Sequence, residues 1–309
     1  ERALNDCVLT LSDVDGIMVA ASQSSMAALS LCEYLVVNPK IFDSTQIGGS
    51  SFMAHLTHAQ AAIAAGLCET VVVAYGSTQR TIGRATASAR EPNPYEVPYK
   101  PMMPPSAYAL AASRHMHEFG TTSEQLAAIK VAASSHAQHN PHAFLQDLVT
   151  VEEVLESPMI SDPLHRLDCC VITDGGGAMV IVSEAVASNL SRHCIPVLGT
   201  GSYVKSTQSG RIDLTHTGAL RSGPIAFAEA EVSPAEIDYV SIYDSFTITV
   251  LITLEDLGFC ERGQAGRFVA DGALLAPHGQ LPFNTDGGGL CNNHPANRGG
   301  MTKVIEAVR

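Results

Sequence analysis

The chain has 309 residues, of which 46% are hydrophobic and 16% charged, so it can bury a sizeable core and disorder is not expected. Its net charge of −13 argues against a nucleic-acid-binding protein, which needs a basic surface. No apolar run reaches the ~18 residues of a membrane span. The eight cysteines form no CxxC pair, which argues against zinc and predicts reduced thiols in a cytoplasmic protein.

The first half of the chain alternates predicted strands and helices. Residues 12–19 predict a junction between a helix and a strand, and residues 41–49 predict a short strand that ends in glycines. The apolar spacing of residues 50–67 is typical of a helix. The run TVVVAY at 70–75 is apolar throughout, as in a central strand that is covered on both faces.

Residues 77–165 break this alternation and are predicted to form an inserted loop domain. They are rich in proline and histidine, and they contain two helical stretches at about 106–119 and 123–139. The strand pattern returns at residues 171–182, where Asp174 and three glycines stand ahead of AMVIV. These glycines are interpreted as part of the fold, because no GxGxxG or Walker pattern for phosphate binding is present.

The second half, from about residue 190, repeats the alternation. It is predicted to contain a strand, a helix, a strand and the start of a helix, at residues 237–243, 246–257, 281–289 and 301–308. A similar pattern of polar, acidic and aliphatic residues occurs at 12–19 and at 233–240, which suggests an internal duplication. Together the two halves predict an α/β fold with parallel or mixed sheets.

Four segments, in this order, resemble the thiolase superfamily, especially its sterol-carrier-protein-type and lipid-transfer-protein branch. They are IGGSSFMAHLTHAQAAIAAGL (47–67), DPLHRLDCCVITDGGGAMVIV (162–182), IDYVSIYDSFTITVLITLEDLGFCERGQAGRF (237–268) and LPFNTDGGGLCNNHPANRGGM (281–301). The resemblance implies the thiolase fold, with duplicated βαβαβαββ halves, mixed sheets in layers and a loop domain. It places the N-terminal half at 1–185, with about 77–165 inserted, and the C-terminal half at 190–309, without its last strands.

The loop before the helix at 50–67 bears on the reaction type. True thiolases carry a nucleophilic cysteine there, and alignment on Ser51 puts Gly49 at that place. Neither Gly48, Gly49 nor Ser50 can form a thiolate. Ser50 is interpreted as a helix cap, and the glycines as room for a substrate, so Gly49 and Ser50 are predicted substrate-binding residues. Acyl transfer to the enzyme is therefore predicted to be lost.

Two side chains are candidates for catalysis. Tyr243 stands where thiolases have the Asn of an Asn-Glu-Ala-Phe motif, and its phenol could exchange a proton with a substrate hydroxyl. His294 aligns with the His of the thiolase Gly-His-Pro motif, whose imidazole would donate to the thioester oxygen. The alternatives are an ordinary half-buried tyrosine and a hydrogen-bonded loop histidine. Asp244 and Asn293, which flank them, are predicted to contact the substrate.

Cys291 and the glycines before it complete the predicted site. Cys291 matches neither catalytic cysteine position of the family, so it is interpreted as a small buried residue beside the substrate, with a rescue nucleophile as the alternative. The triple glycine 287–289, with Gly288 at its centre, is predicted to let the backbone approach the thioester.

The reading favoured by these residues is an acyl-CoA aldolase. It would cleave a β-hydroxyacyl-CoA, with a steroid side chain as one possible acyl group, to a ketone or aldehyde and a shorter acyl-CoA such as propionyl-CoA. The alternatives are an acetyl-CoA acetyltransferase or thiolase, which needs a reactive thiol, and a non-catalytic lipid-CoA-binding or scaffold subunit. No cofactor is predicted beyond the CoA of the substrate. The resemblance further implies a homodimer and a partner subunit with an OB-fold and a zinc ribbon, without nucleic acid or membrane.

Overall fold

The chain forms two compact units in a computed structural model that describes residues 1–21, 23–82, 94–296 and 299–309. Unit 1 comprises residues 1–88, 172–197 and 295–309, and unit 2 comprises residues 89–171 and 198–294. Residues 83–93 of the predicted insertion lie outside the described residues. The predicted boundary between two duplicated halves near residue 185 stays a prediction. Among the described helices, none is long and apolar enough to cross a membrane.

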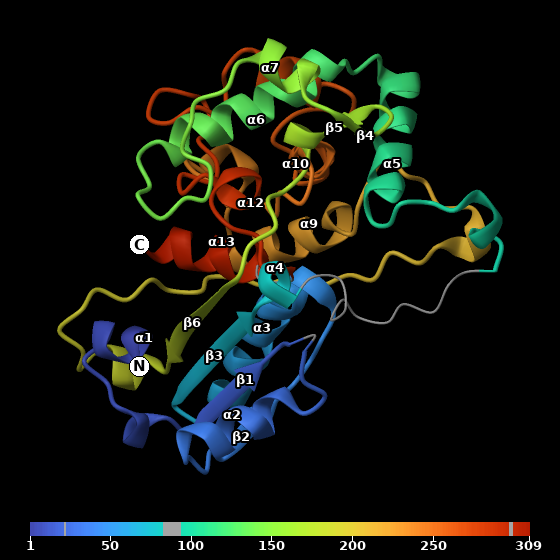
Figure 1. Ribbon diagram of the computed structural model, residues 1–309. Helices are drawn as coiled ribbons and strands as arrows, with labels where there is room; N and C mark the ends of the chain where they lie inside the picture. Colours follow the sequence, from blue (N-terminus) through green and yellow to red (C-terminus); the bar gives the residue numbers. More distant parts are fainter. Residues whose placement is uncertain (22, 83–93, 297–298) are drawn as a thin grey trace. The chain divides into compact units, whose positions relative to one another are not determined.

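Unit 1 is built on a mixed sheet with the strand order β2-β1-β3-β6 (Figure 1). The first three strands are parallel, and β6 runs antiparallel to β3. Its strands are β1 (Gly16–Val19), β2 (Ile41–Asp43), β3 (Thr70–Ser77) and β6 (Gly175–Val182). Its helices are α1 (Arg2–Asp6), α2 (Ala27–Leu35), α3 (Ser51–Ala64), α4 (Gln79–Ile82), α8 (Glu184–Ala187) and α13 (Gly299–Val308). The predicted mixed α/β architecture is confirmed for this unit.

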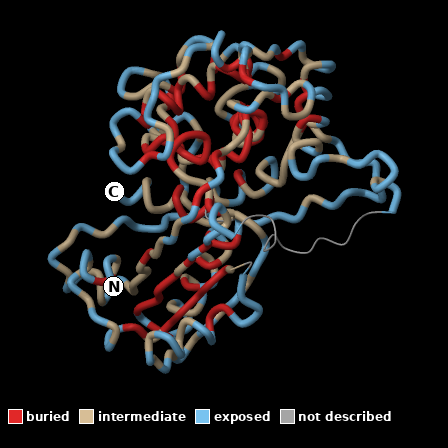
Figure 2. Tube along the Cα trace, viewed as in Figure 1, coloured by how far each residue is buried: buried red, intermediate tan, exposed pale blue. Residues whose placement is uncertain are grey.

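Both faces of this sheet are covered, as the continuous apolar runs Ile17–Val19 of β1 and Val71–Ala74 of β3 require. Along β1, Ile17 and Val19 join a cluster with the alanines of α2, while Met18 points into a cluster with α3 and α13. The same alternation places Val72 on the α2 face and Val73 on the α3 face. Side chains on a strand alternate between the two faces, so a continuous apolar run is what a doubly covered strand requires. Figure 2 shows β1 and β3 as buried.

Unit 2 is mainly helical and is organised around α6 (Figure 1). α6 is buried along most of its length and packs against α7, α10, α11 and α12. The helices are α5 (Pro105–Phe119), α6 (Ser123–Ala137), α7 (Val151–Glu156), α9 (Ala219–Ala230), α10 (Thr247–Asp256), α11 (Ala265–Ala270) and α12 (Gly288–Cys291). A short hairpin joins β4 (Met159–Ser161) to β5 (Leu164–His165). The predicted helices at 106–119, 123–139 and 246–257 are confirmed within a few residues.

The two strands predicted for the second half are not formed as ladders in the described residues. The backbones of segments 237–243 and 281–289 pair at an isolated parallel bridge between Val240 and Phe283. The ladder stops because the backbone of Asn284 has a φ of 41°, and its side chain replaces the next backbone pairing. The following glycines then start the helical turn α12 instead of extending a strand. The prediction of a strand over 281–289 was therefore wrong in its second part.

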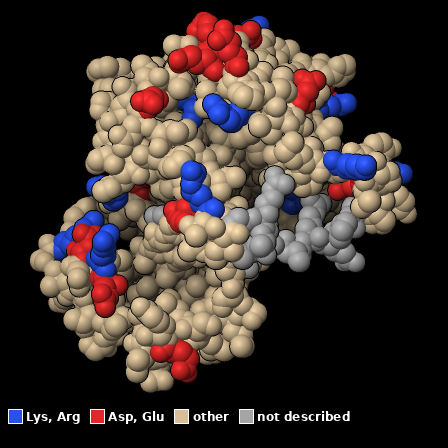
Figure 3. All heavy atoms as spheres, in the orientation of Figure 1, with Lys and Arg blue, Asp and Glu red and all other residues tan. Residues whose placement is uncertain are grey.

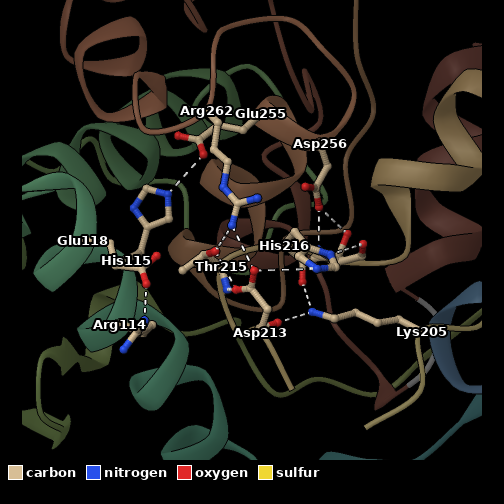
Figure 4. A network of polar contacts seen from close by, with 11 residues as sticks. Arg114, His115, Glu118, Lys205, Asp213, Thr215, His216, Glu255, Asp256 and Arg262 are labelled. Atoms are coloured by element: carbon tan, nitrogen blue, oxygen red, sulfur yellow. Dashed lines mark hydrogen bonds and ion pairs between the residues drawn. The ribbon is translucent and has the colours of Figure 1, made fainter. Parts of the chain in front are cut away.

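A polar network ties the loop around residues 205–217 to the helices of unit 2 (Figure 4). Arg262 pairs with Asp213, and Asp256 accepts hydrogen bonds from the backbone and side chain of Thr217. Nearby, His115 on α5 contacts Glu255 on α10 with 3.1 Å between Nε2 and Oε2. Burial disfavours the charged form of Glu255, but hydrogen bonds from His115 and from backbone N–H groups outweigh it and lower the pKa of Glu255. The network fixes this loop against the scaffold that carries the site described below.

Candidate active site

Tyr243 and His294 form a direct pair in unit 2. The hydroxyl of Tyr243 lies 2.8 Å from Nε2 of His294, and the two rings meet edge-on at a centroid distance of 5.5 Å. Tyr243 follows the Val240 bridge and precedes α10, whereas His294 follows α12. Both side chains are partly exposed. The two predicted catalytic residues, 51 positions apart in sequence, are therefore brought within hydrogen-bond distance, where one proton can be shared between phenol and imidazole.

Asp244, next to Tyr243, holds the turn that leads to His294. Its Oδ1 accepts the N–H of Gly289 at 2.8 Å, and its Oδ2 accepts the N–H of Leu290 at 3.1 Å. The residue is 1% exposed. Because both carboxylate oxygens bind backbone N–H groups, Asp244 acts within the scaffold as a cap for α12. Its predicted contact with a substrate stays a prediction.

The glycines at 287–289 are explained by packing inside the unit. Gly287 and Gly288 have φ values of 89° and 59°, which favour glycine. A Cβ on Gly287 would lie 2.6 Å from the Cβ of Ala137, and one on Gly288 would collide with the carboxylate of Asp244. The turn therefore needs glycine to let Asp244 reach its N–H groups. The predicted approach of the Gly288 backbone to a thioester stays a prediction.

Three amide and carboxylate side chains that the sequence reasoning missed hold the same segment. The side chain of Asn284 both accepts the N–H of Ile242 and donates to its carbonyl, each at 2.9 Å. Asp286 accepts the N–H of Gly288 at 2.8 Å and the side-chain N–H of Asn292 at 2.7 Å. The signal available in the sequence is the alternation of Asn and Asp with glycine, which is typical of side chains that bond to local backbone.

Asn293 and Cys291 lie between these anchors and His294. Asn293 is partly exposed, and its backbone N–H donates to Gly288 at 3.2 Å. Cys291 is buried, in agreement with the sequence prediction, and its Sγ accepts a hydrogen bond from Nζ of Lys130 at 3.1 Å. Lys130 was not a candidate in the sequence, because a single lysine in an alanine-rich helix carries no motif. The predicted substrate contacts of Asn293 and Cys291 are not tested by this geometry.

The loop at the start of α3 belongs to unit 1 and carries no thiol. Gly48–Ser50 form a 3-10 turn, and Gly48 has a φ of 78° with no atom within 4 Å of an added Cβ. Ser50 occupies the predicted N-cap position of α3, but its side chain makes no capping hydrogen bond. Ser51 holds the turn instead, accepting the N–H of Ile47 at 2.9 Å and donating to the carbonyl of Gly48 at 2.7 Å. The backbone is already helical at Ser50, which removes the extended geometry that a capping serine needs.

Four cysteines of unit 2 are poorly suited to act as thiolates. Burial raises the pKa of Cys169, Cys170 and Cys260 to about 12 in each case. Burial also raises the pKa of Cys291, although the ammonium of Lys130 opposes that shift. A thiol nucleophile needs a lowered pKa and an accessible sulfur. In the described residues, no group of three or more His, Cys, Asp or Glu side chains is arranged to hold a metal ion.

Known proteins resemble the chain over nearly its whole length. Residues 201–309 match the family model for thiolase C-terminal domain-like sequences. A steroid side-chain-cleaving aldolase of Thermomonospora curvata is 32% identical over 326 residues, covering 99% of this chain and 83% of the relative. An acetyl-CoA acetyltransferase of Methanothermobacter thermautotrophicus is 38% identical over 213 residues, covering 66% of this chain and 54% of the relative. The solved structure of an Ltp2-ChsH2(DUF35) aldolase is 32% identical, with a TM-score of 0.87 over 99% of this chain and 81% of that one.

The mixed sheet of unit 1 and the relatives that cover nearly the whole chain define a thiolase-like protein. The chain belongs to the thiolase superfamily, in the sterol-carrier-protein-type branch that includes steroid side-chain-cleaving aldolases. This membership confirms the family and the fold class predicted from the four sequence segments.

Proposed function

We propose that this chain is an acyl-CoA lyase that cleaves a β-hydroxyacyl-CoA between Cα and Cβ by a retro-aldol reaction. The observation that carries the proposal is the 2.8 Å contact between the hydroxyl of Tyr243 and Nε2 of His294. The family membership supports the same reaction, because a side-chain-cleaving aldolase and a 17-hydroxy-3-oxo-4-pregnene-20-carboxyl-CoA lyase each cover 99% of this chain at 32% identity. The proposed acyl group is a steroid side chain, which would leave a ketone or aldehyde and a shorter acyl-CoA such as propionyl-CoA.

The pair can perform both proton transfers of this reaction. The oxygen of Tyr243 accepts the proton of the β-hydroxyl while its own proton passes to Nε2 of His294. The Cα–Cβ bond then breaks, its electron pair forms the thioester enolate, and the β-carbon becomes the carbonyl of the ketone or aldehyde. The imidazolium of His294 stabilises the enolate oxygen, and the proton returns to Cα to give the shorter acyl-CoA. Every atom and proton is accounted for without an oxidant or an acyl-enzyme.

The second candidate is a thiolase or acetyltransferase, which the archaeal acetyl-CoA acetyltransferase relative favours through its 38% identity. This activity requires a cysteine that carries the acyl group, and the turn Gly48–Ser50 supplies none. The raised pKa of the buried Cys291 also argues against it as a substitute. A non-catalytic lipid-CoA-binding subunit is the third candidate, and it would show no turnover at all.

The experiment that separates these functions is a substrate panel with and without free CoA. The protein is incubated with β-hydroxyacyl-CoA and β-ketoacyl-CoA thioesters, and the products are identified by mass spectrometry. The lyase should convert β-hydroxyacyl-CoA to a carbonyl compound and a shorter acyl-CoA at the same rate in both conditions, because no CoA enters the reaction. Iodoacetamide should leave this rate unchanged, since no thiol takes part.

Two results would contradict the lyase. Products that form only when free CoA is added would establish thiolysis of a β-ketoacyl-CoA instead. An acyl adduct trapped on any side chain and released by hydroxylamine would establish covalent catalysis. Absence of turnover on the whole panel, with the partner described next also present, would favour the non-catalytic subunit.

We further propose that the chain acts as a homodimer together with an OB-fold partner. β2 pairs only with β1 among the described strands of unit 1, and Phe42 and Ile47 beside this edge are each 59% exposed. An open strand edge with exposed apolar side chains suits pairing with a second copy. The proposed partner is supported by the related Ltp2-ChsH2(DUF35) aldolase, whose name includes a second component, ChsH2(DUF35).

Light scattering tests both associations. The chain alone should have twice its single-chain mass, and Phe42→Glu should shift it to one copy because a charge would be buried at the paired edge. Tyr99→Glu, at an exposed tyrosine of unit 2, serves as the control and should leave the mass unchanged. A wild-type protein that elutes as a single copy at all concentrations contradicts the homodimer, and no mass increase with a co-encoded DUF35 protein contradicts the partner.

A further inference from the structure

Lys130 is a buried cation whose hydrogen bonds go to α12. The residue lies on α6 and is 1% exposed. Its Nζ donates to the carbonyl oxygen of Leu290 at 2.7 Å and to Sγ of Cys291 at 3.1 Å. Removing an ammonium group from water is costly unless hydrogen bonds compensate. Both of these bonds go to the single helical turn α12, which indicates that the buried cation stabilises that turn.

The turn α12 depends on contacts at both of its ends. Three backbone hydrogen bonds close this turn, from Cys291 to Gly287 and from Asn292 and Asn293 to Gly288. A helix this short is not stable alone. Asp244 fixes the N–H groups at one end and Lys130 fixes the carbonyl of Leu290 at the other. Leu290 is thus held through both its N–H and its C=O.

Displacement of this turn would move His294. A Cβ built on Gly289 lies 3.1 Å from Cδ2 of His294, so the backbone of α12 packs directly against the imidazole ring. His294 follows Cys291 by three residues, and its Nε2 must stay within hydrogen-bond distance of Tyr243. The position of the Leu290 carbonyl, which Lys130 holds, is therefore coupled to the distance between Tyr243 and His294.

We propose that Lys130 is a positioning residue that keeps His294 in register with Tyr243 by holding the Leu290 carbonyl and the Cys291 sulfur. This role deepens the proposed lyase function and rests on it. It adds a residue on α6 to a site otherwise built from segments 242–244 and 284–294. Lys130 bonds to Leu290 and Cys291, so it acts on the pair through α12.

A neighbouring cavity makes the proposal testable by substitution. A cavity of about 430 Å³ borders Lys130, and Asp147, Glu153, Glu156 and Arg166 also line it. Figure 3 shows acidic side chains gathered over α7 in this region. A side chain of similar length without the charge has room beside such a cavity, so the variant Lys130→Met should fold.

The test compares Lys130→Met with Lys100→Met, at an exposed lysine of the same unit. Amide hydrogen exchange should accelerate at least about tenfold at Cys291 and Asn292 in Lys130→Met, which corresponds to the loss of one hydrogen bond to a charged group. Exchange in α10 and the thermal midpoint should stay close to wild type. The kcat for cleavage should fall about tenfold with KM nearly unchanged, and Lys130→Gln, which keeps a donor, should recover part of both effects.

The outcomes distinguish this inference from the proposed function. Unchanged exchange at Cys291 and Asn292 in Lys130→Met would overturn the positioning role whatever the activity. Faster exchange in a protein whose wild type shows no lyase activity would refute the function while the structural link from Lys130 to α12 stands. If Lys130→Met does not fold, the exchange of Lys130→Gln decides the question by the same criterion.

Discussion

Tyr243→Phe should lower kcat for C–C cleavage by about a thousandfold, within the range of factors measured for loss of a general acid–base group. The phenylalanine keeps the ring and its edge-on packing against His294 but removes the oxygen that accepts the proton of the β-hydroxyl. Binding of the thioester should change little, so KM should move far less than kcat. Steady-state kinetics with a β-hydroxyacyl-CoA substrate provide the measurement.

A matched control for this variant lies on the same segment. Tyr239→Phe removes a hydroxyl that is 3.5 Å from the side chain of Thr285, so its kcat should be close to wild type. Equal losses in both variants would mean that Tyr243 supports the fold and not the reaction. The double variant Tyr243→Phe with His294→Gln should be about as slow as the slower single variant, because groups that act as a unit are strongly non-additive.

Asp244→Ala should lower the free energy of unfolding by about 3 kcal/mol, since two buried N–H groups lose their acceptor at about 1–3 kcal/mol each. The affected groups belong to Gly289 and Leu290, in the turn that precedes His294. The alanine is smaller than the carboxylate and leaves a gap beside Gly288, so no new contact compensates. Urea unfolding at neutral pH measures the change.

The effect of Asp244 can be separated from that of a carboxylate on the surface. Asp238→Ala, at an exposed position six residues earlier, should change the unfolding free energy by less than about 0.5 kcal/mol. Asp244→Asn should be intermediate, because the amide keeps one acceptor oxygen for the two N–H groups. A loss for Asp244→Ala no larger than that of the control would show that α12 does not depend on the carboxylate.

The sequence was sufficient to predict secondary structure in segments where the local periodicity agrees with the burial of the side chains. The spacing over 50–67 predicted α3 because it extends over enough residues to indicate a helical period. The run at 70–75 predicted a covered strand because it is short and rich in valine, which favours strands. The prediction of secondary structure from sequence failed over residues 281–289. There, an isolated apolar stretch looks like a strand, but the positive φ of Asn284 and the side chain of Asp244 redirect the backbone into α12.

The two candidate catalytic residues of the site could also be recognised from the sequence. Tyr243 and His294 were found because each falls in a motif of the resembling family, although their direct contact could not be inferred from residues 51 positions apart. The supporting residues were missed, because Lys130, Asn284 and Asp286 act through backbone groups that only the folded chain brings near them. Such contacts leave no periodic signal.

The glycine turn has a consequence for attempts to change the acyl group that the protein accepts. Gly287 and Gly288 face neighbouring atoms with no space for a methyl group, and Gly300 of α13 meets the carbonyl of Gly49 equally closely within unit 1. Libraries randomised at these glycines would consist mostly of unfolded variants. Directed evolution should instead diversify Asn293, whose partly exposed side chain stands next to His294 without a glycine-only backbone, and so alter selectivity at little cost in solubility or yield.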